Sequence, residues 1–325
     1  MKTLTLTTLA CAIAMSCSLV HAETSTSGEL TKNFYGDLRA QTQWMQGRDF
    51  ETSVYQATAG IKGMYKTPLA NVIYHGEVQY SESDLASNQV DVREAYFVFK
   101  THGYGAFVAG TGATGSYLQM YTPFDIHQSN SMHPDTAAQL FRQSKYGTRV
   151  IAYATPAWQT PIGAFDMKFG LVTPDANTGK DDDIKTARLN YKAGPVSLSV
   201  HRAQTSKQLL NKEEDYIRWN LFAKYEWENS YIAALKEFHD ECPTKTEEVY
   251  GAVYSISHGA FDTGITYQYK TWDSTLQRDD IHLTIASVKY NYDEHIALFV
   301  EGAHYSEALN EYSDSNVSLG FIFSF

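Results

Sequence analysis

Hydrophobic and polar residues alternate along much of the chain with the period of two that is typical of β-strands. The alternation is clearest in four segments, at residues 164–171, 216–225, 261–270 and 317–325. In the last segment Val317, Leu319 and Phe321 share one face, whereas Ser318 and Gly320 share the other. Each segment has about the ten residues that a tilted strand needs to cross a bilayer. The pattern therefore predicts an all-β fold whose sheet has one apolar and one polar face.

Tight turns and long polar segments alternate between the predicted strands. Turn-forming residues mark seven tight connections, at 67–70, 102–105, 155–156, 193–195, 226–230, 257–259 and 292–294. Eight wider polar segments lie between them, at 45–53, 81–89, 111–145, 173–183, 204–214, 239–246, 271–279 and 306–314. Together these connections link sixteen strands, and short turns at one end with long loops at the other are typical of outer-membrane barrels.

A soluble β-sandwich or a solenoid is the main alternative to a barrel. Strands in globular proteins are usually nearer five or six residues, and the sequence has neither clear amphipathic helices to cover an apolar sheet nor a fixed internal repeat. In lipid an open sheet edge leaves unpaired backbone groups that cost several kcal/mol each. The first strand, at about 34–43, is therefore expected to pair with the last, at about 315–325. We predict a transmembrane antiparallel β-barrel of about sixteen strands.

The first 22 residues have the organisation of a cleaved signal peptide. Lys2 supplies a positive charge, residues 4–20 are uncharged and apolar or small, and Ala22 is the small residue expected before a cleavage site. Cleavage after Ala22 gives a signal peptide at 1–22 and a barrel at 23–325. The alternatives are a buried N-terminal helix and a lipid-modified Cys17. Cleavage removes Cys11 and Cys17, which leaves Cys242 without a partner for an internal disulfide.

Composition argues against several other classes of protein. Aromatic residues make up 14% of the chain and charged residues only 19%, which argues against disorder. The formal net charge of −11 argues against a nucleic-acid partner, and the expected cleavage makes the mature chain one charge more negative. Beyond the signal there is no run of 18 apolar residues, which argues against membrane-spanning helices.

Catalytic and metal-binding motifs are missing from the sequence. There is no G-x-S-x-G elbow, no H-E-x-x-H and no P-loop, so we expect no enzyme, no cofactor and no metal site. A lipase with Ser and His on the outer barrel face is the remaining catalytic alternative. The segment 175–183 has the ligand spacing of a calcium loop but lacks the closing Glu. We interpret it as an acidic external loop that attracts divalent ions near lipopolysaccharide.

Short motifs spread over the chain support a more specific assignment. They are Phe34-Tyr35-Gly36, the segment 91–98 followed by 103–110, Tyr153-Ala154-Thr155-Pro156, and the final Phe325. Together they resemble the general porins of the Gram-negative outer membrane, which are trimeric sixteen-stranded barrels. One departure is Gly110-Thr111-Gly112, which lacks the Gly-Arg step common in that family. The resemblance implies a homotrimer in contact with outer membrane lipid and lipopolysaccharide, inserted by the barrel-insertion machinery through Phe325.

The segment 111–145 is long and has no clear periodicity. A stretch of that length without secondary structure is uncommon in a compact fold unless it is functional. In general porins the third external loop folds into the lumen and narrows it, so the resemblance implies that 111–145 is a constriction loop. The alternative is a large surface loop that contacts solvent only.

A sixteen-stranded barrel leaves a water-filled channel, in which opposed charges across a constriction orient water and dipolar solutes. Strand parity places five candidate constriction residues on the wall: Arg39, Lys62, Arg93, Asp37 and Glu77. The loop candidates are Asp125, Asp135 and His127. Other residues predicted to face the lumen are Lys168, Arg188 and Arg218.

The sharpest hypothesis is that Arg39 and Arg93 face Asp125 across the narrowest point. Arg93 also matches a constriction position of the family by its motif. Phe97 and Phe99 share the parity of Arg93, which leaves room for an aromatic track for sugars inside the pore.

The sequence thus favours a porin that lets ions and small hydrophilic solutes diffuse passively across the outer membrane. The negative net charge gives a weak preference for cations. The alternatives are a substrate-selective channel, for example for a sugar or oligosaccharide, and a non-conducting barrel that binds partners at the cell surface.

Overall fold

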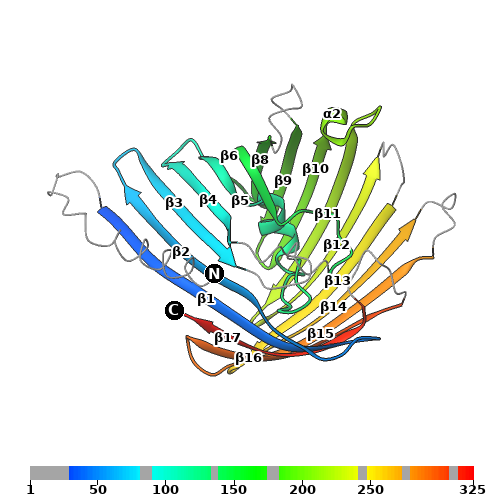
Figure 1. Cartoon of the computed structure of the whole chain (residues 1–325). Coiled ribbons are helices and arrows are strands. Elements are labelled where there is room, and N and C mark those ends of the chain that lie inside the picture. The colour runs from blue at the N-terminus through cyan, green and yellow to red at the C-terminus, as the bar shows by residue number, and fades with distance from the viewer. Residues whose placement is uncertain are drawn as a thin grey trace.

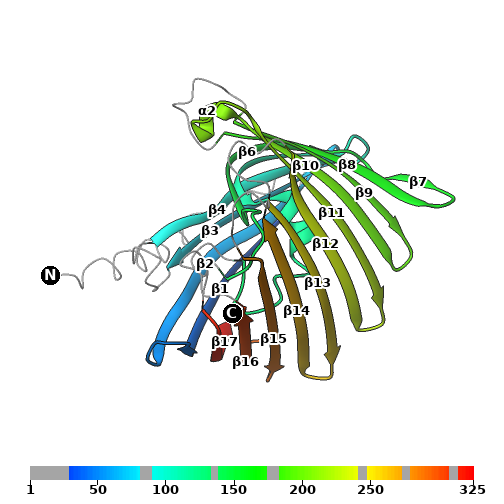
Figure 2. The ribbon, with the colours of Figure 1, turned by 90° about the vertical axis from the view of Figure 1, so that its right-hand side faces the viewer.

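The chain forms one continuous β-sheet that curves back on itself into a barrel (Figures 1 and 2). The computed structural model describes residues 29–80, 90–132, 138–173, 183–240, 247–272, 279–306 and 314–325. The strands are β1 (Glu29–Met45), β2 (Glu51–Lys66), β3 (Ala70–Tyr80), β4 (Val90–Thr101), β5 (Ala106–Ala113), β6 (Tyr146–Ala154), β7 (Trp158–Thr160), β8 (Gly163–Val172), β9 (Ile184–Ala193), β10 (Val196–Thr205), β11 (Tyr216–Trp227), β12 (Ser230–Asp240), β13 (Glu247–His258), β14 (Phe261–Trp272), β15 (Ile281–Asn291), β16 (Ile296–Tyr305) and β17 (Asn316–Ser324). Neighbouring strands pair antiparallel, and a short helix α2 (Lys207–Leu210) follows β10.

β6 and β7 together form one interrupted barrel strand. Both pair with β8, β6 through Ala154 opposite Lys168 and β7 through Trp158 opposite Phe165. The barrel therefore has sixteen strands, as predicted. The turn expected at 155–156 is wrong, because the strand resumes after Pro156 and the chain reverses at 161–162, between β7 and β8. Proline has no backbone N–H for the ladder, so it interrupts the strand without ending it.

β1 and β17 close the barrel. Their register runs from Asp37 opposite Ser324 to Met45 opposite Asn316. Gly36 and Phe325 extend it with two backbone hydrogen bonds of 2.9 and 3.0 Å. The predicted pairing of the first and last strands is confirmed, and this pairing satisfies the backbone groups of both.

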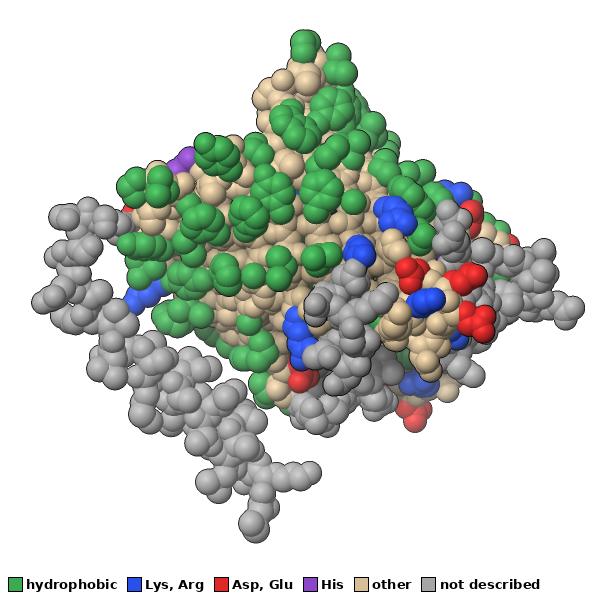
Figure 3. Space-filling model, turned by 90° about the horizontal axis from the view of Figure 1, so that it is seen from above, with side chains coloured by type: hydrophobic (Ala, Val, Ile, Leu, Met, Phe, Trp, Pro, Cys, Tyr) green, Lys and Arg blue, Asp and Glu red, His purple; other side chains and the backbone are tan. Residues whose placement is uncertain are grey.

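The outer face of the barrel is largely apolar. In β17, Val317, Leu319 and Phe321 are exposed, whereas Ser318 between them is fully buried, as the period-two pattern predicts. Figure 3 shows hydrophobic side chains spread over most of one face, with Lys, Arg, Asp and Glu gathered toward one side of it. An exposed apolar surface of this extent requires an apolar environment. Among the described helices, none has the length and apolar character needed to span a membrane.

A β-bulge shifts the alternation within β4. Glu77 of β3 pairs with Glu94, but the next residue, Val78, pairs with Val92. Arg93 is therefore an extra residue in β4, opposite no residue of β3.

The bulge changes which side chains of β4 face the lumen. After it, Tyr96 and Val98 border an internal cavity, whereas Phe97 and Phe99 are exposed on the outer face. The predicted aromatic track of Phe97 and Phe99 inside the pore is therefore wrong. Parity counted from Arg93 fails because one inserted residue moves all later side chains to the opposite face.

The β5–β6 loop, residues 114–145, folds into the barrel, as predicted for the constriction loop. It begins with a helical turn, η2 (Tyr117–Tyr121), and its buried residues pack against the inner face of β11 to β16. Phe124 and Phe141 of the loop form an edge-to-face pair 5.4 Å apart beside Gly251 of β13. A Cβ atom at Gly251 would lie 2.5 Å from Phe141 and 2.9 Å from Phe124, so glycine permits the close packing.

Some sequence expectations fall outside the described residues. These are the signal peptide at 1–22, Cys242, and the acidic segment 175–183 apart from Asp183. The described barrel begins with β1 at Glu29, within the expected range 23–325.

Candidate functional site

Polar side chains of β1 to β4 form a connected cluster on the inner wall. Tyr35 donates a hydrogen bond of 2.6 Å to Glu77 Oε2 and also contacts His75 Nε2. The other ring nitrogen, His75 Nδ1, lies 2.7 Å from Glu94 Oε2. Because Tyr35 donates its one proton to Glu77, it accepts a hydrogen bond from His75 Nε2. The cluster thus places a histidine between two carboxylates.

Arg93 connects this cluster to the end of the β5–β6 loop. Its Nη1 donates a hydrogen bond of 3.0 Å to Gln79 Oε1, and its Nε donates to the hydroxyl of Tyr146. The Nε atom also lies 3.1 Å from Glu77 Oε1, close enough for an ion pair but without a directed hydrogen bond. Arg93 is therefore a positive charge held in a fixed position on the lumen wall.

Arg39 joins the wall directly to the loop. Its Nε donates a hydrogen bond of 2.6 Å to Asp37, and its Nη1 donates one of 3.0 Å to Gln128 Oε1 of the loop. Nearby, the Nζ of Lys62 lies 4.9 Å from the centre of the Tyr35 ring, in a cation–π contact. The five predicted wall residues, Arg39, Lys62, Arg93, Asp37 and Glu77, thus lie together on the inner face of β1 to β4. Their role in a constriction stays a prediction.

Asp125 does not face Arg39 and Arg93. Its carboxylate is buried inside the loop, 2.8 Å from Lys145 Nζ, and it also accepts from the hydroxyl of Tyr117. Burial raises the pKa of Asp125, but the Lys145 ammonium, together with hydrogen bonds from Tyr117 and the backbone N–H of Met132, holds this pKa below its usual range. The hypothesis that Asp125 opposes the two arginines across the passage is wrong, because the loop folds around its own ion pair.

His127 is also buried between the loop and the wall. Its Nδ1 lies 2.9 Å from Ser287 Oγ, and its Nε2 lies 2.8 Å from Thr266 Oγ1. Burial lowers the pKa of His127 to about 4, so the ring is neutral at neutral pH. His127 therefore fastens the loop to β14 and β15 rather than carrying charge into the passage. The third loop candidate, Asp135, lies outside the described residues.

Two wall carboxylates that sequence reasoning missed hold the loop in place. Glu301 of β16 accepts hydrogen bonds from the backbone N–H groups of Gln128, at 2.7 Å, and Asn130, at 2.6 Å. Glu237 of β12 accepts one of 2.8 Å from the backbone N–H of Arg142. The alternation of residues along β12 and β16 places both acids on the lumen side. Nothing in the sequence around them shows that they accept hydrogen bonds from backbone N–H groups of the loop. At these two contacts the wall supplies the carboxylate and the loop supplies the donors, whereas at Arg39 the wall donates to the loop.

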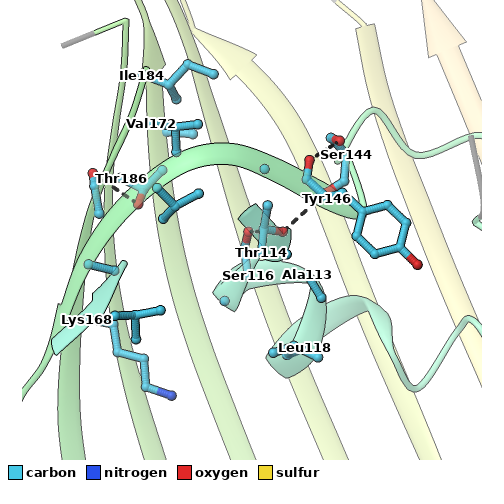
Figure 4. A pocket seen from close by; sticks show the side chains of 18 of the residues that line it. Ala113, Thr114, Ser116, Leu118, Ser144, Tyr146, Lys168, Val172, Ile184 and Thr186 are labelled. Carbon is cyan, nitrogen blue, oxygen red and sulfur yellow. Dashed lines mark hydrogen bonds between the residues drawn. The ribbon is translucent and has the colours of Figure 1, made fainter. Parts of the chain in front are cut away.

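A second region of the lumen lies beside β4 to β11. It is a cavity of about 770 Å³, closed on one side by the two ends of the β5–β6 loop. Figure 4 shows Lys168, Val172 and Ile184 on one side, across from Ser116 and Leu118 of the loop. The three other lumen candidates, Lys168, Arg188 and Arg218, all border this cavity. They lie on a different part of the wall from Arg39 and Arg93.

Comparisons with known proteins agree with this geometry. A family model described as Gram-negative porin matches residues 7–320. Similar solved structures include OmpF of Salmonella typhi in complex with daunomycin, with 12% identity, a TM-score of 0.74, and coverage of 90% of this chain and 97% of that one. An anion-selective porin from Comamonas acidovorans has 12% identity, a TM-score of 0.69 and coverage of 91% and 100%.

A third similar structure is the trimer form of the outer membrane protein OmpT of Vibrio cholerae. It has 14% identity, a TM-score of 0.67, and coverage of 91% of this chain and 99% of that one. At such identities the likeness shows a shared fold. A search of curated proteins finds no match to the sequence.

Proposed function

Because the chain belongs to the Gram-negative porin family, it forms a channel for small solutes in the outer membrane, and we propose that ions and small hydrophilic solutes cross it by passive diffusion. The observation that carries this proposal is the β5–β6 loop, which lies inside the barrel and is linked to the charged β1–β4 wall by Arg39 and Gln128. A passage bordered by fixed charges admits small hydrated solutes and slows larger or apolar ones.

We place the constriction between the β1–β4 wall and the part of the loop around Gln128. The wall residues of this proposal are Arg39, Lys62, Arg93, Asp37 and Glu77. On the loop side, the side-chain amide of Gln128 faces Arg39, where the sequence analysis expected the carboxylate of Asp125. The Arg39 to Gln128 hydrogen bond supports this placement, because it is a contact between the wall and the loop.

Assembly and processing are further parts of the proposal. We propose a homotrimer in contact with lipid and lipopolysaccharide, supported by the trimer form of the similar OmpT structure. We also propose that residues 1–22 are removed as a signal peptide and that the barrel acts as a channel and not as an enzyme. Recognition of Phe325 by the barrel-insertion machinery stays a prediction.

Single-channel recording of the purified protein in a planar lipid bilayer tests this function. We expect stable conductance in KCl, and a trimer should give steps in groups of three. Passive diffusion without a binding step predicts that the current rises linearly with the KCl concentration. Folded protein that inserts without conducting would overturn the proposal in favour of a closed surface-binding barrel. A gradient of KCl across the same bilayer reports ion preference.

A further inference from the structure

Two positive side chains face each other on the wall of the β4–β11 cavity. Lys168 of β8 and Arg188 of β9 are direct partners in the sheet, and Arg188 is in turn opposite His201 of β10. All three border the same cavity, midway along their strands. Like charges directly opposite one another destabilise a sheet pair. Lys168, Arg188 and His201 thus form a row across β8, β9 and β10, and the two positive charges in this row require an explanation.

No direct ion pair neutralises the row, although Asp166 attracts both cations from farther away. Among the described residues, no carboxylate lies within ion-pair distance of Lys168 or Arg188. The nearest acid on β8, Asp166, accepts a hydrogen bond of 2.6 Å from Asn190. Arg188 is only 5% exposed and donates from Nη1 to the carbonyl oxygen of Gly115 in the loop. Its buried Nε has no hydrogen-bond partner. A buried, partly unsatisfied guanidinium is costly unless an anion joins it.

The remainder of the cavity lining combines small and apolar residues with hydroxyl and amide side chains and two further cations, Arg142 and Arg218. Val98, Val108, Val150, Val172 and Ile184 line it, as do several glycines and alanines. The one carboxylate in the lining is Glu94, which is occupied by His75 at 2.7 Å. Cavities of this size, with apolar walls and a few convergent polar groups, are typical small-molecule sites.

We propose that this cavity binds small organic anions in which one carboxylate is attached to an apolar body. The carboxylate of the solute lies between Lys168 and Arg188. There it accepts a hydrogen bond from the Nε–H group of Arg188, which has no partner in the protein, and it separates the two positive charges. The apolar body contacts the valine and isoleucine side chains. The inference rests on the proposed function, because the solute reaches the cavity through the channel. It adds a preferred solute class to a channel that otherwise selects by size and charge.

Benzoate and benzamide are matched probes, since they share a shape and differ in charge. In planar bilayers at low KCl, where chloride competes least, benzoate should reduce the wild-type current saturably, and benzamide should not. Calorimetric titration of the detergent-solubilised protein should show the same preference without any need for conductance. Arg188→Gln and Lys168→Gln should each raise the half-saturating benzoate concentration by about tenfold, the effect expected from losing one charge-assisted hydrogen bond.

Lys192→Gln is the matched control. It removes the same charge from β9, four residues from Arg188, at an exposed position outside the cavity lining. Benzoate block that persists in this variant but weakens in Arg188→Gln and Lys168→Gln supports the site. Equal effects of benzoate and benzamide, or block unchanged in both cavity variants, overturn it. Channels that conduct KCl but neither bind benzoate nor respond to it refute the site alone, whereas missing KCl conductance refutes the proposed function.

Discussion

Arg93 and Glu94 are consecutive residues, and both side chains lie on the lumen side of the barrel. Regular alternation would send one of them outward, but the bulge in β4 removes Arg93 from the ladder. Arg93 then pairs with Glu77, and Glu94 lies 2.7 Å from His75. The bulge thus places two charged side chains next to each other on the lumen wall.

Arg93 should set part of the ion preference of the channel. Replacing Arg93 by Gln removes one positive charge beside Glu77 and Glu94. The ratio of the K⁺ permeability to the Cl⁻ permeability should therefore increase. A unit charge about 10 Å from the ion path in water favours one ion and disfavours the other by about twofold each, which changes the cation-to-anion ratio by about fourfold. The reversal potential in a KCl gradient measures the shift. Arg93→Lys, which keeps the charge, is the control, and an unchanged reversal potential in Arg93→Gln would exclude Arg93 from the constriction.

Glu301 should be the main fastening of the loop. Glu301→Ala leaves the backbone N–H groups of Gln128 and Asn130 without an acceptor in a buried position, at a cost of about 1–3 kcal/mol for each group. We expect a looser loop, seen as larger and noisier single-channel currents. Glu294→Ala, at an exposed residue of the β15–β16 turn, should leave the currents unchanged. If Glu301→Ala gave single-channel currents as small and steady as those of the wild type, Glu301 would not be the main attachment of the loop.

Loop docking should weaken in mild acid because of His127. Its pKa is about 4 when the loop is docked and about 6.5 when the ring is in water, so protonation favours release. Stability is therefore lost as the pH falls from about 6.5 to 4, and the loss reaches the order of 2 kcal/mol at pH 5. Thermal unfolding or channel noise at pH 7 and pH 5 measures this difference.

The control for this pH dependence is His127→Gln, which keeps a donor and an acceptor near Ser287 and Thr266 but does not titrate. Asp125 remains ionised through the window, since its pKa is already held below its usual range. The variant should therefore lose most of the difference between pH 7 and pH 5. A difference of wild-type size in the variant would assign the effect to other groups.

Gly251 should be intolerant of any side chain. Gly251→Ala places a methyl group against Phe141 and Phe124, both held in the packed interior of the loop. Overpacking of this kind costs about 1–3 kcal/mol and should displace the loop from β13. Gly76→Ala on β3, where the nearest atom is 3.8 Å away, should have little effect. Melting temperatures and conductance of the two variants provide the comparison, and equal values would contradict the tight contact.

Much of the fold was predictable because alternation and turn chemistry are local properties. The outward faces of β11, β14 and β17 and the pairing of β1 with β17 follow from them directly. The errors arise where a single residue disturbs the ladder. The bulge at Arg93 turned Phe97 outward, and Pro156 interrupted a strand instead of ending it.

The candidate site was harder to predict because the loop has no period. Parity placed Arg39 and Arg93 on the inner wall, but Asp125 found its partner in Lys145 within the same loop. The role of Glu301 depends on amides 171 to 173 residues away in the chain, as its contacts with Asn130 and Gln128 show. Such long-range contacts leave no mark in local sequence.

The attachment of the loop through its peptide groups has a consequence for how this channel can be altered. Glu301 grips main-chain N–H groups, which every residue except proline possesses. The side chain of Gln128 can therefore be exchanged while its backbone N–H keeps its hydrogen bond to Glu301. A library at this one site would vary the side chain that meets Arg39 while the attachment of the loop stays constant, so that each new current could be attributed to the exchanged side chain.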